Sequence, residues 1–203
     1  MDPLLLAIFF VPVMILVYVF FLKDRFDRRA HMQSSQVDRQ KIQKKLIKKN
    51  SNFLPGEYHF FRILRQPPSD ALEFEQEDGT LVGSLVLKDF DRSFLGEDRH
   101  TYELKFNEET YQVDYRWGIF LKNSWGVLLT EINLIWPRTQ TNFQLGAEIY
   151  TYHKYFWGEA AITQGGELLM FSRPSGLQSK SLVLIKHGMS DEFHVIALAL
   201  SAP

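Results

Sequence analysis

The sequence predicts a mainly β protein: an antiparallel β-barrel or meander of about 10–12 strands with a short buried C-terminal helix, preceded by one transmembrane helix. Three observations support this class. Residues 3–22 carry no charge, short apolar runs alternate with turn signals after Gly56, and aromatic residues make up 14% of the chain. The 203 residues have room for one compact domain. We therefore expect a transmembrane helix (1–22), a basic juxtamembrane helix or linker (23–56) and a β-rich domain (57–203).

The predicted transmembrane helix begins at Pro3 and ends at Leu22, with the sequence PLLLAIFFVPVMILVYVFFL. At 1.5 Å of rise per residue it is about 30 Å long, which matches the hydrocarbon layer of a bilayer. Only two residues precede it and bulky side chains end it, unlike a cleaved signal peptide. Pro12 lies in the middle of the span, where it predicts a kink that a partner helix can accommodate.

The distribution of charge predicts the orientation of this span. Residues 23–49 carry ten Lys or Arg and three Asp, a net charge of +7, whereas the remainder from residue 50 carries −7. Because Lys23, Arg25, Arg28 and Arg29 directly follow the span, the positive-inside rule places the N-terminus outside and the β-rich domain in the cytoplasm. A periplasmic or lumenal domain is the competing outcome.

The basic segment has two interpretations. Residues 37–49 (VDRQKIQKKLIKK) are rich in helix formers, with an apolar stripe too sparse for a coiled coil, which favours a solvated helical stalk. The alternative is a polybasic patch that binds anionic lipid headgroups. Its candidate residues are Lys23, Arg25, Arg28, Arg29, Lys41, Lys44, Lys45, Lys48 and Lys49. Nucleic acid is not expected as a partner, because the folded part of the chain is acidic.

Six fragments of the β-rich domain alternate apolar and polar residues: YHFFRIL, ALEFEQEDGTLVGSLVLKDF, TYELKFNEETYQVDYRW, GIFLKNSWGVLLTEINLIW, AEIYTYHKYFWGEAAITQGGELLMF and SLVLIKH. Turn signals separate strands within them at Asp78-Gly79, Asn107-Glu108-Glu109, Asn123-Ser124 and Gly165-Gly166. The series of hairpins predicts an antiparallel meander.

The C-terminal segment breaks the strand pattern. We expect Asp191 to cap a short helix over residues 193–200, which is apolar on nearly every side and requires burial. A meander followed by SLVLIKHGMS and DEFHVIALALSA, with the hairpin EAAITQGGELLMFSRP, resembles the tubby-like or LURP-one-related fold shared with the phospholipid scramblases. The resemblance covers residues 58–202 and implies a closed barrel around the terminal helix. The chain differs from scramblases in its N-terminal span and in lacking cysteine.

Motifs for catalysis are sparse in this sequence. It contains no G-x-S-x-G, no H-E-x-x-H and no glycine-rich phosphate loop, and without cysteine it can form no thiolate metal site. His187 and His194 would need Asp191 or Glu192 to complete a metal site, and packing or surface roles fit them better. The EFEQE run at residues 73–77 is typical of a solvated strand face. We predict no catalytic residue, no cofactor and no metal.

Tryptophans are concentrated in the middle of the chain, at Trp117, Trp125, Trp136 and Trp157. Core packing explains most aromatic residues of a β-rich domain, but any of the four that is exposed would be a candidate partner surface.

Together these features predict a single-span, membrane-anchored, non-enzymatic accessory or assembly subunit of a membrane protein complex, with an integral membrane protein as its partner. The alternative is a lipid-binding or lipid-handling module of tubby or scramblase type, with membrane lipids as its partners. An enzyme with an unrecognised pocket is the third hypothesis.

Overall fold

The computed structural model describes residues 39–40, 42–44, 46, 53–65, 71–92, 98–134, 139–155, 158–174 and 179–202. The chain separates into two units, Met1–Gln40 and Lys41–Pro203, and the fold below is that of the second. Among the described residues, no helix is long and apolar enough to cross a membrane. The predicted span from Pro3 through Pro12 to Leu22 lies outside them.

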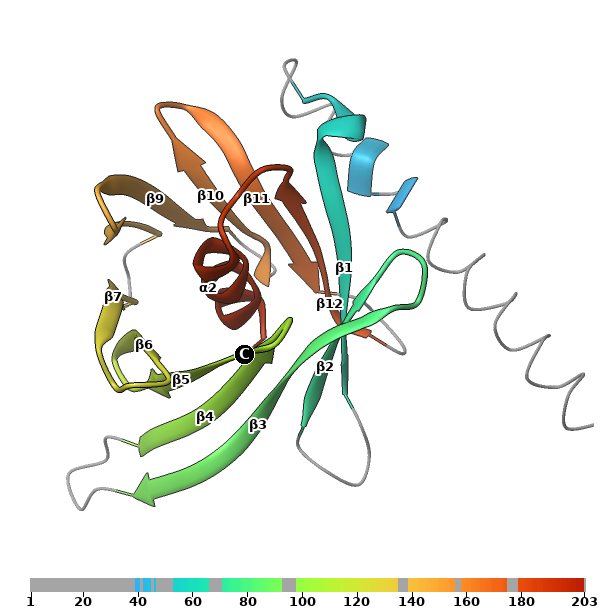
Figure 1. Ribbon diagram of the computed structural model, residues 1–203. Helices are drawn as coiled ribbons and strands as arrows, with labels where there is room; N and C mark the ends of the chain where they lie inside the picture. Colours follow the sequence, from blue (N-terminus) through green and yellow to red (C-terminus); the bar gives the residue numbers. More distant parts are fainter. Residues whose placement is uncertain are drawn as a thin grey trace, which may run out of the picture. The chain divides into compact units, whose positions relative to one another are not determined.

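The second unit is a twelve-stranded antiparallel sheet followed by one α-helix (Figure 1). Its elements in chain order are η1 (Pro55–Glu57), β1 (Tyr58–Arg65), β2 (Leu72–Gln76), β3 (Leu81–Arg92), β4 (Asp98–Phe106), β5 (Glu109–Tyr115), β6 (Gly118–Asn123), β7 (Leu128–Asn133), β8 (Gln140–Leu145), β9 (Glu148–Lys154), β10 (Ala160–Gln164), β11 (Glu167–Pro174), β12 (Ser179–Lys186) and α2 (Asp191–Ser201). The predicted mainly β class, the strand number and the C-terminal helix are confirmed.

The sheet curls into a nearly closed barrel because its first and last strands pair. β1 and β12 are antiparallel neighbours, so the edges of the sheet are β7 and β8. Side chains bridge these two edges. The Thr130 hydroxyl donates a hydrogen bond of 2.6 Å to the Gln144 carbonyl, and the Thr141 hydroxyl donates one of 2.8 Å to the Asn133 carbonyl. A seam between β7 and β8 thus replaces one backbone ladder.

Helix α2 lies inside the barrel (Figure 1). Every residue from Phe193 to Ser201 is buried. The helix packs against inward-facing side chains from strands all round the sheet, including Phe61, Phe74, Leu104, Val113, Ile119, Leu121, Ile132, Ile162, Met170 and Val183. An apolar helix of this kind is stable because the sheet removes all of its faces from water.

The N-terminus of α2 is capped by Ser190, not by the predicted Asp191. The Ser190 hydroxyl accepts a hydrogen bond of 3.3 Å from the Phe193 N–H. Asp191 lies in the first turn, where it accepts a hydrogen bond of 3.2 Å from the Asn107 amide in the β4–β5 turn. A carboxylate in this position favours the positive end of the helix dipole.

The C-terminal carbonyls of α2 are satisfied by barrel side chains. Ser181 donates a 2.7 Å hydrogen bond to the Ser201 carbonyl, and Tyr115 donates one of 2.7 Å to the Ala199 carbonyl. Carbonyls at a buried helix end need such partners, so these two strand residues help to fix the helix in the barrel.

A second apolar cluster covers the outer face of β1, β10, β11 and β12. It contains Tyr58, Phe60, Ala161, Leu168, Phe171, Leu182 and Leu184. Ile42 and Leu46, from a helical segment before the barrel, and Phe53 are buried in the same cluster. These strands therefore bury both faces, which explains their near-continuous apolar sequences. We expected the apolar side chains of residues 37–49 to lie on a solvated stalk. Two of them, Ile42 and Leu46, are buried instead.

Five hairpin turns of two to four residues lie at one end of the barrel, which we call the tight-turn end. Since successive antiparallel connections alternate between the two ends, this end carries the turns at 77–80, 107–108, 124–127, 146–147 and 165–166, together with the link 187–190 into α2. Asn107 and Gly188 adopt positive φ there. Four of these turns fall where the sequence signals predicted them, whereas the turn at 146–147 was not predicted. The link 187–190 brings the start of α2 beside the β4–β5 turn.

Candidate functional site

The β6–β7 turn presents an exposed tryptophan on a well-fixed backbone. The Asn123 side-chain oxygen accepts hydrogen bonds from the N–H groups of Trp125 (3.0 Å) and Val127 (2.9 Å). Two backbone bonds close the same turn, and Gly126 supplies the positive φ of 77° that it requires. Exposure is 87% for Trp125, 58% for Val127 and 50% for Leu128. Hydrogen bonds therefore fix the backbone of this turn while its apolar side chains are exposed to solvent.

A groove of about 450 Å³ lies next to this turn. Trp125 and Leu129 line it from the β6–β7 hairpin, and the buried Tyr111 lines it from β5. Its charged lining residues come from two further places at the tight-turn end: Glu108 and Glu109 in and after the β4–β5 turn, and Glu192 in the first turn of α2. Elements distant in sequence thus converge on one recess.

The electrostatics of this groove are one-sided, because no Lys, Arg or His is among the described residues that line it. The Tyr111 hydroxyl donates a short hydrogen bond to Glu109. Burial raises the pKa of Tyr111 above its ordinary value of 10, and the hydrogen bond to Glu109 and the negative charges of Glu109, Glu192 and Asp191 raise it further. Within the described residues, neither Glu109 nor Glu192 forms an ion pair, and the same holds for Glu108.

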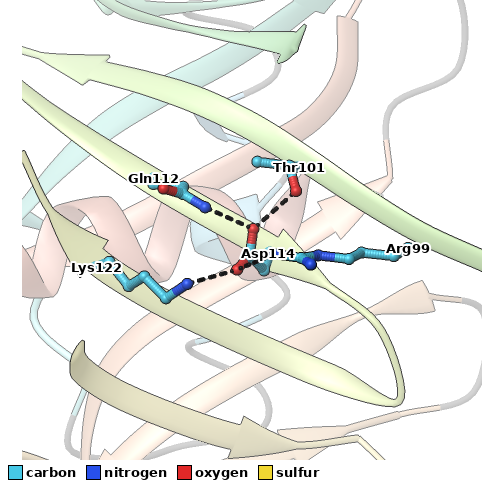
Figure 2. A network of polar contacts seen from close by, with 5 residues as sticks. All are labelled: Arg99, Thr101, Gln112, Asp114 and Lys122. Atoms are coloured by element: carbon cyan, nitrogen blue, oxygen red, sulfur yellow. Dashed lines mark hydrogen bonds and ion pairs between the residues drawn. The ribbon is translucent and has the colours of Figure 1, made fainter. Parts of the chain in front are cut away.

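A different carboxylate, Asp114, sits on the outer face of β5 and is surrounded by donors (Figure 2). Thr101 and Gln112 donate hydrogen bonds of 2.9 and 3.0 Å to one of its oxygens. Lys122 and Arg99 contact the other at 2.9 and 3.3 Å. The side chain is only 2% exposed. All four donors come from β4, β5 and β6, so the pairing of these strands assembles the network.

The pKa of Asp114 reflects this surplus of donors. Burial alone would raise it, but the hydrogen bonds from Gln112, Lys122 and Thr101 and the positive charge of Lys122 outweigh burial and lower it to about 2. A carboxylate with two cations and two neutral donors already in contact has little capacity left for a ligand, so we assign this network to stabilisation of the sheet.

Three histidines gather at the tight-turn end. The rings of His59 and His187 stack with centroids 4.0 Å apart, and His194 lies 6.2 Å from His59. His194 is buried, with its Nδ1 2.8 Å from the Ser190 carbonyl and its ring stacked on Phe106. Partial burial lowers the pKa of His59, and the neighbouring His187 and His194 lower it further.

Within the part of the chain that the structure describes, no group of three or more His, Asp or Glu is arranged to hold a metal ion. His187 and His194, with Asp191 or Glu192, therefore do not come together as a metal site there. Side chains of α2 pack into the interior of the barrel, where other barrels hold a ligand.

The four predicted surface tryptophans separate in the structure. Trp117 and Trp125 are exposed, but they lie at opposite ends of the six-residue strand β6, roughly 20 Å apart. Trp117 is 45% exposed and packs its ring edge-on against Phe120 at 5.1 Å. Trp136 and Trp157 lie outside the described residues. Of the two described tryptophans, only Trp125 combines high exposure with a groove.

Among the predicted lipid-headgroup residues, Lys44 is described and is exposed. The others lie outside the described residues: Lys23, Arg25, Arg28, Arg29, Lys41, Lys45, Lys48 and Lys49.

Sequence reasoning missed both the groove and the Asp114 network. Glu108 and Glu109 were interpreted only as turn residues, and Glu192 only as a possible metal ligand. Asp114 carries no local signal at all, because its partners follow from strand register. Glu75, expected on a solvated strand face, is buried and forms an ion pair of 3.8 Å with the buried Arg62.

Comparisons with protein-family models, with curated proteins and with solved structures give no match for this chain.

Proposed function

We propose that this chain is a single-span, membrane-anchored, non-enzymatic accessory or assembly subunit, and that its barrel docks on an integral membrane protein partner through the β6–β7 turn. The observation that carries the proposal is the exposure of Trp125, Val127 and Leu128 on a backbone fixed by Asn123. Tryptophan is enriched at the energetic centres of protein interfaces, and fixing it in advance lowers the entropy lost on binding.

Two further features support a docking role over catalysis. The barrel is filled by its own helix α2, so its interior is a packed core. The strongly perturbed carboxylate, Asp114, is saturated by its own donors instead of facing a cleft. Perturbed groups that face a cleft are the usual mark of an active site.

The anchor and its topology are part of the same proposal. The uncharged stretch 3–22 and the net charge of +7 over residues 23–49 support one span with the N-terminus outside and the barrel in the cytoplasm. Membership of the tubby-like family stays a prediction. The twelve strands around a C-terminal helix agree with the architecture that the resemblance implies.

The test is purification of the full chain from its native membrane in mild detergent, with an affinity tag at the N-terminus because the described C-terminal residues are buried. We expect stoichiometric partners with the wild-type chain and their loss with the Trp125→Ala, Val127→Ser double variant. Trp117→Ala is the matched control, because it removes an exposed tryptophan at the other end of β6. A wild-type chain that purifies alone would contradict the proposal.

A lipid-binding or lipid-handling module is the second candidate, favoured by the charge of +7 beside the predicted span and by the exposed Lys44. In nanodiscs, amide exchange in residues 39–46 should slow with anionic lipid relative to neutral lipid. Equal exchange in both lipids removes the reason for this candidate.

A further inference from the structure

We infer that the groove beside Trp125 receives an arginine side chain of the partner protein. The inference rests on the proposed docking function and names the chemistry that the partner must present. It depends on three observations about the groove. These are its shape and aromatic wall, the sign of its charge, and the lack of an ion-pair partner for its glutamates among the described residues.

The shape suits one long side chain. A groove of about 450 Å³ has ample volume for a single arginine. Trp125 stands on one wall with most of its ring free, and the partly buried Leu129 and the buried Tyr111 provide apolar surface for a methylene stem. A guanidinium is planar and stacks on an indole face while its stem packs on apolar groups.

The charge of the groove is negative and comes from two places in the fold. Glu108 lies in the β4–β5 turn, Glu109 begins β5, and Glu192 lies in the first turn of α2. Burial and the hydrogen bond to Glu109 are the larger causes of the raised pKa of Tyr111, and the negative charges of Glu109, Glu192 and Asp191 raise it further. A guanidinium offers five N–H donors and can meet more than one carboxylate at once, whereas a lysine ammonium acts as a point charge.

Other carboxylates of the barrel are paired with cations. Asp114 contacts Lys122 and Arg99, Glu103 contacts Lys88 and Lys105, and Glu167 contacts Lys186. Among the described residues, the three glutamates of the groove form no such pair. Negative charge concentrated beside an exposed tryptophan and left without a cation is complementary to a cationic partner.

The direct test uses the full chain in mild detergent with ¹⁵N-labelled tryptophan and the probe peptide acetyl-Gly-Arg-Gly-amide. The indole N–H signal of Trp125, assigned with Trp125→Phe, should shift with millimolar affinity. The matching lysine peptide should bind several-fold more weakly than the arginine peptide. The citrulline peptide, which is neutral but similar in shape, should bind at least about tenfold more weakly than the arginine peptide. An equal shift with citrulline, or no shift with arginine at 50 mM, overturns the inference.

The charge requirement is tested with the Glu108→Gln, Glu192→Gln double variant, which should weaken the arginine peptide about fivefold or more. The matched control is Glu103→Gln, which neutralises a carboxylate that already has lysine partners and should leave the affinity unchanged. If both variants bind the peptide equally, the carboxylates of the groove do not recognise the guanidinium.

The same variants separate this inference from the proposed function. In the co-purification, loss of partner with Trp125→Ala, Val127→Ser but full retention with Glu108→Gln, Glu192→Gln leaves the docking function standing and overturns the arginine inference. Loss with both supports the two together. If the wild-type chain purifies alone, the docking function fails, whereas the peptide titration still reports whether the groove selects a guanidinium.

Discussion

The two ends of strand β5 carry carboxylates with opposite surroundings. Near its end, Asp114 is buried and in contact with Lys122, Arg99, Thr101 and Gln112 (Figure 2). At its start, Glu109 is exposed, bonded to a tyrosine and grouped with two other glutamates. The residue chemistry is nearly the same, so the difference arises from neighbours. Donors and cations from the paired strands surround one carboxylate, whereas the other has a tyrosine donor and no cation partner among the described residues.

If the Asp114 network stabilises the sheet, Asp114→Ala should cause the largest loss of stability among the variants considered. The substitution leaves Lys122 and the Thr101 and Gln112 donors without their acceptor at a position where the carboxylate is only 2% exposed. We expect the free energy of unfolding to fall by about 2–4 kcal/mol. Urea unfolding of the full chain in mild detergent measures it, and Asp114→Asn should fall between this variant and the wild type. A loss below about 0.5 kcal/mol would show that the network is not structural.

Acid should remove the same contribution. The pKa of Asp114 is about 2 in the folded chain and 3.8 ordinarily, so the unfolded chain takes up a proton first as the pH falls. Its stabilising contribution is therefore complete above pH 4 and is lost between about pH 4 and pH 2. After allowance for screening we expect a loss of about 1–2 kcal/mol across this window. The Asp114→Asn variant should show a flatter stability profile over the same range, and identical profiles would contradict the assignment.

The histidine cluster at the tight-turn end gives a smaller effect in a different pH window. Groups that face His59 are His187 from the end of β12 and His194 from α2. Because the pKa of His59 is lowered in the folded chain, the unfolded chain binds the proton more readily, and stability falls as the pH drops below about 6.5. His59→Gln should reduce this slope between pH 6.5 and 5 by under about 1 kcal/mol in total. Thermal unfolding at several pH values measures it, and an unchanged slope would exclude His59 as its source.

The smallest effect is expected for the glutamates of the groove. Glu108 has no ion-pair partner among the described residues, so Glu108→Gln should change the free energy of unfolding by less than about 0.5 kcal/mol. Glu192→Gln should lose about 0.3–0.5 kcal/mol, because a charge in the first turn of α2 favours the helix dipole. Thermal unfolding beside Asp114→Ala makes the contrast quantitative. A loss above about 1.5 kcal/mol for Glu108→Gln would mean that the groove is structural as well.

Local features of the fold were predictable. The turns at Asp78-Gly79 and Gly165-Gly166 depend on dipeptides whose backbone preferences act over two to four residues. The apolar C-terminal segment was expected to be a buried helix because no face of it tolerates water. Its cap was misassigned by one residue, from Ser190 to Asp191, since both side chains suit an N-cap.

Features that depend on distant neighbours were not predictable. The seam at Thr130 and Thr141 exists only because β1 pairs with β12 and leaves β7 and β8 as edges. Burial of Ile42 and Leu46 requires an apolar outer face on β1 and β12. Alternation within a strand does not predict that its second face is covered as well. The candidate site also depends on distant neighbours. Nothing in the sequence favoured Trp125 over the other three tryptophans, and the structure places it in one groove with Glu108 and Glu192.

By itself, the sequence determined the antiparallel β class, the positions of four turns, the burial of the last helix and the uneven distribution of charge, because each follows from hydrophobic periodicity, turn chemistry or composition. Only the tertiary structure decided which carboxylates have cations and which do not. That outcome depends on strand register and on where α2 enters the barrel. Both are set by contacts between residues far apart in sequence, such as Asn107 and Asp191, 84 positions apart, and Tyr58 and Leu168, 110 positions apart.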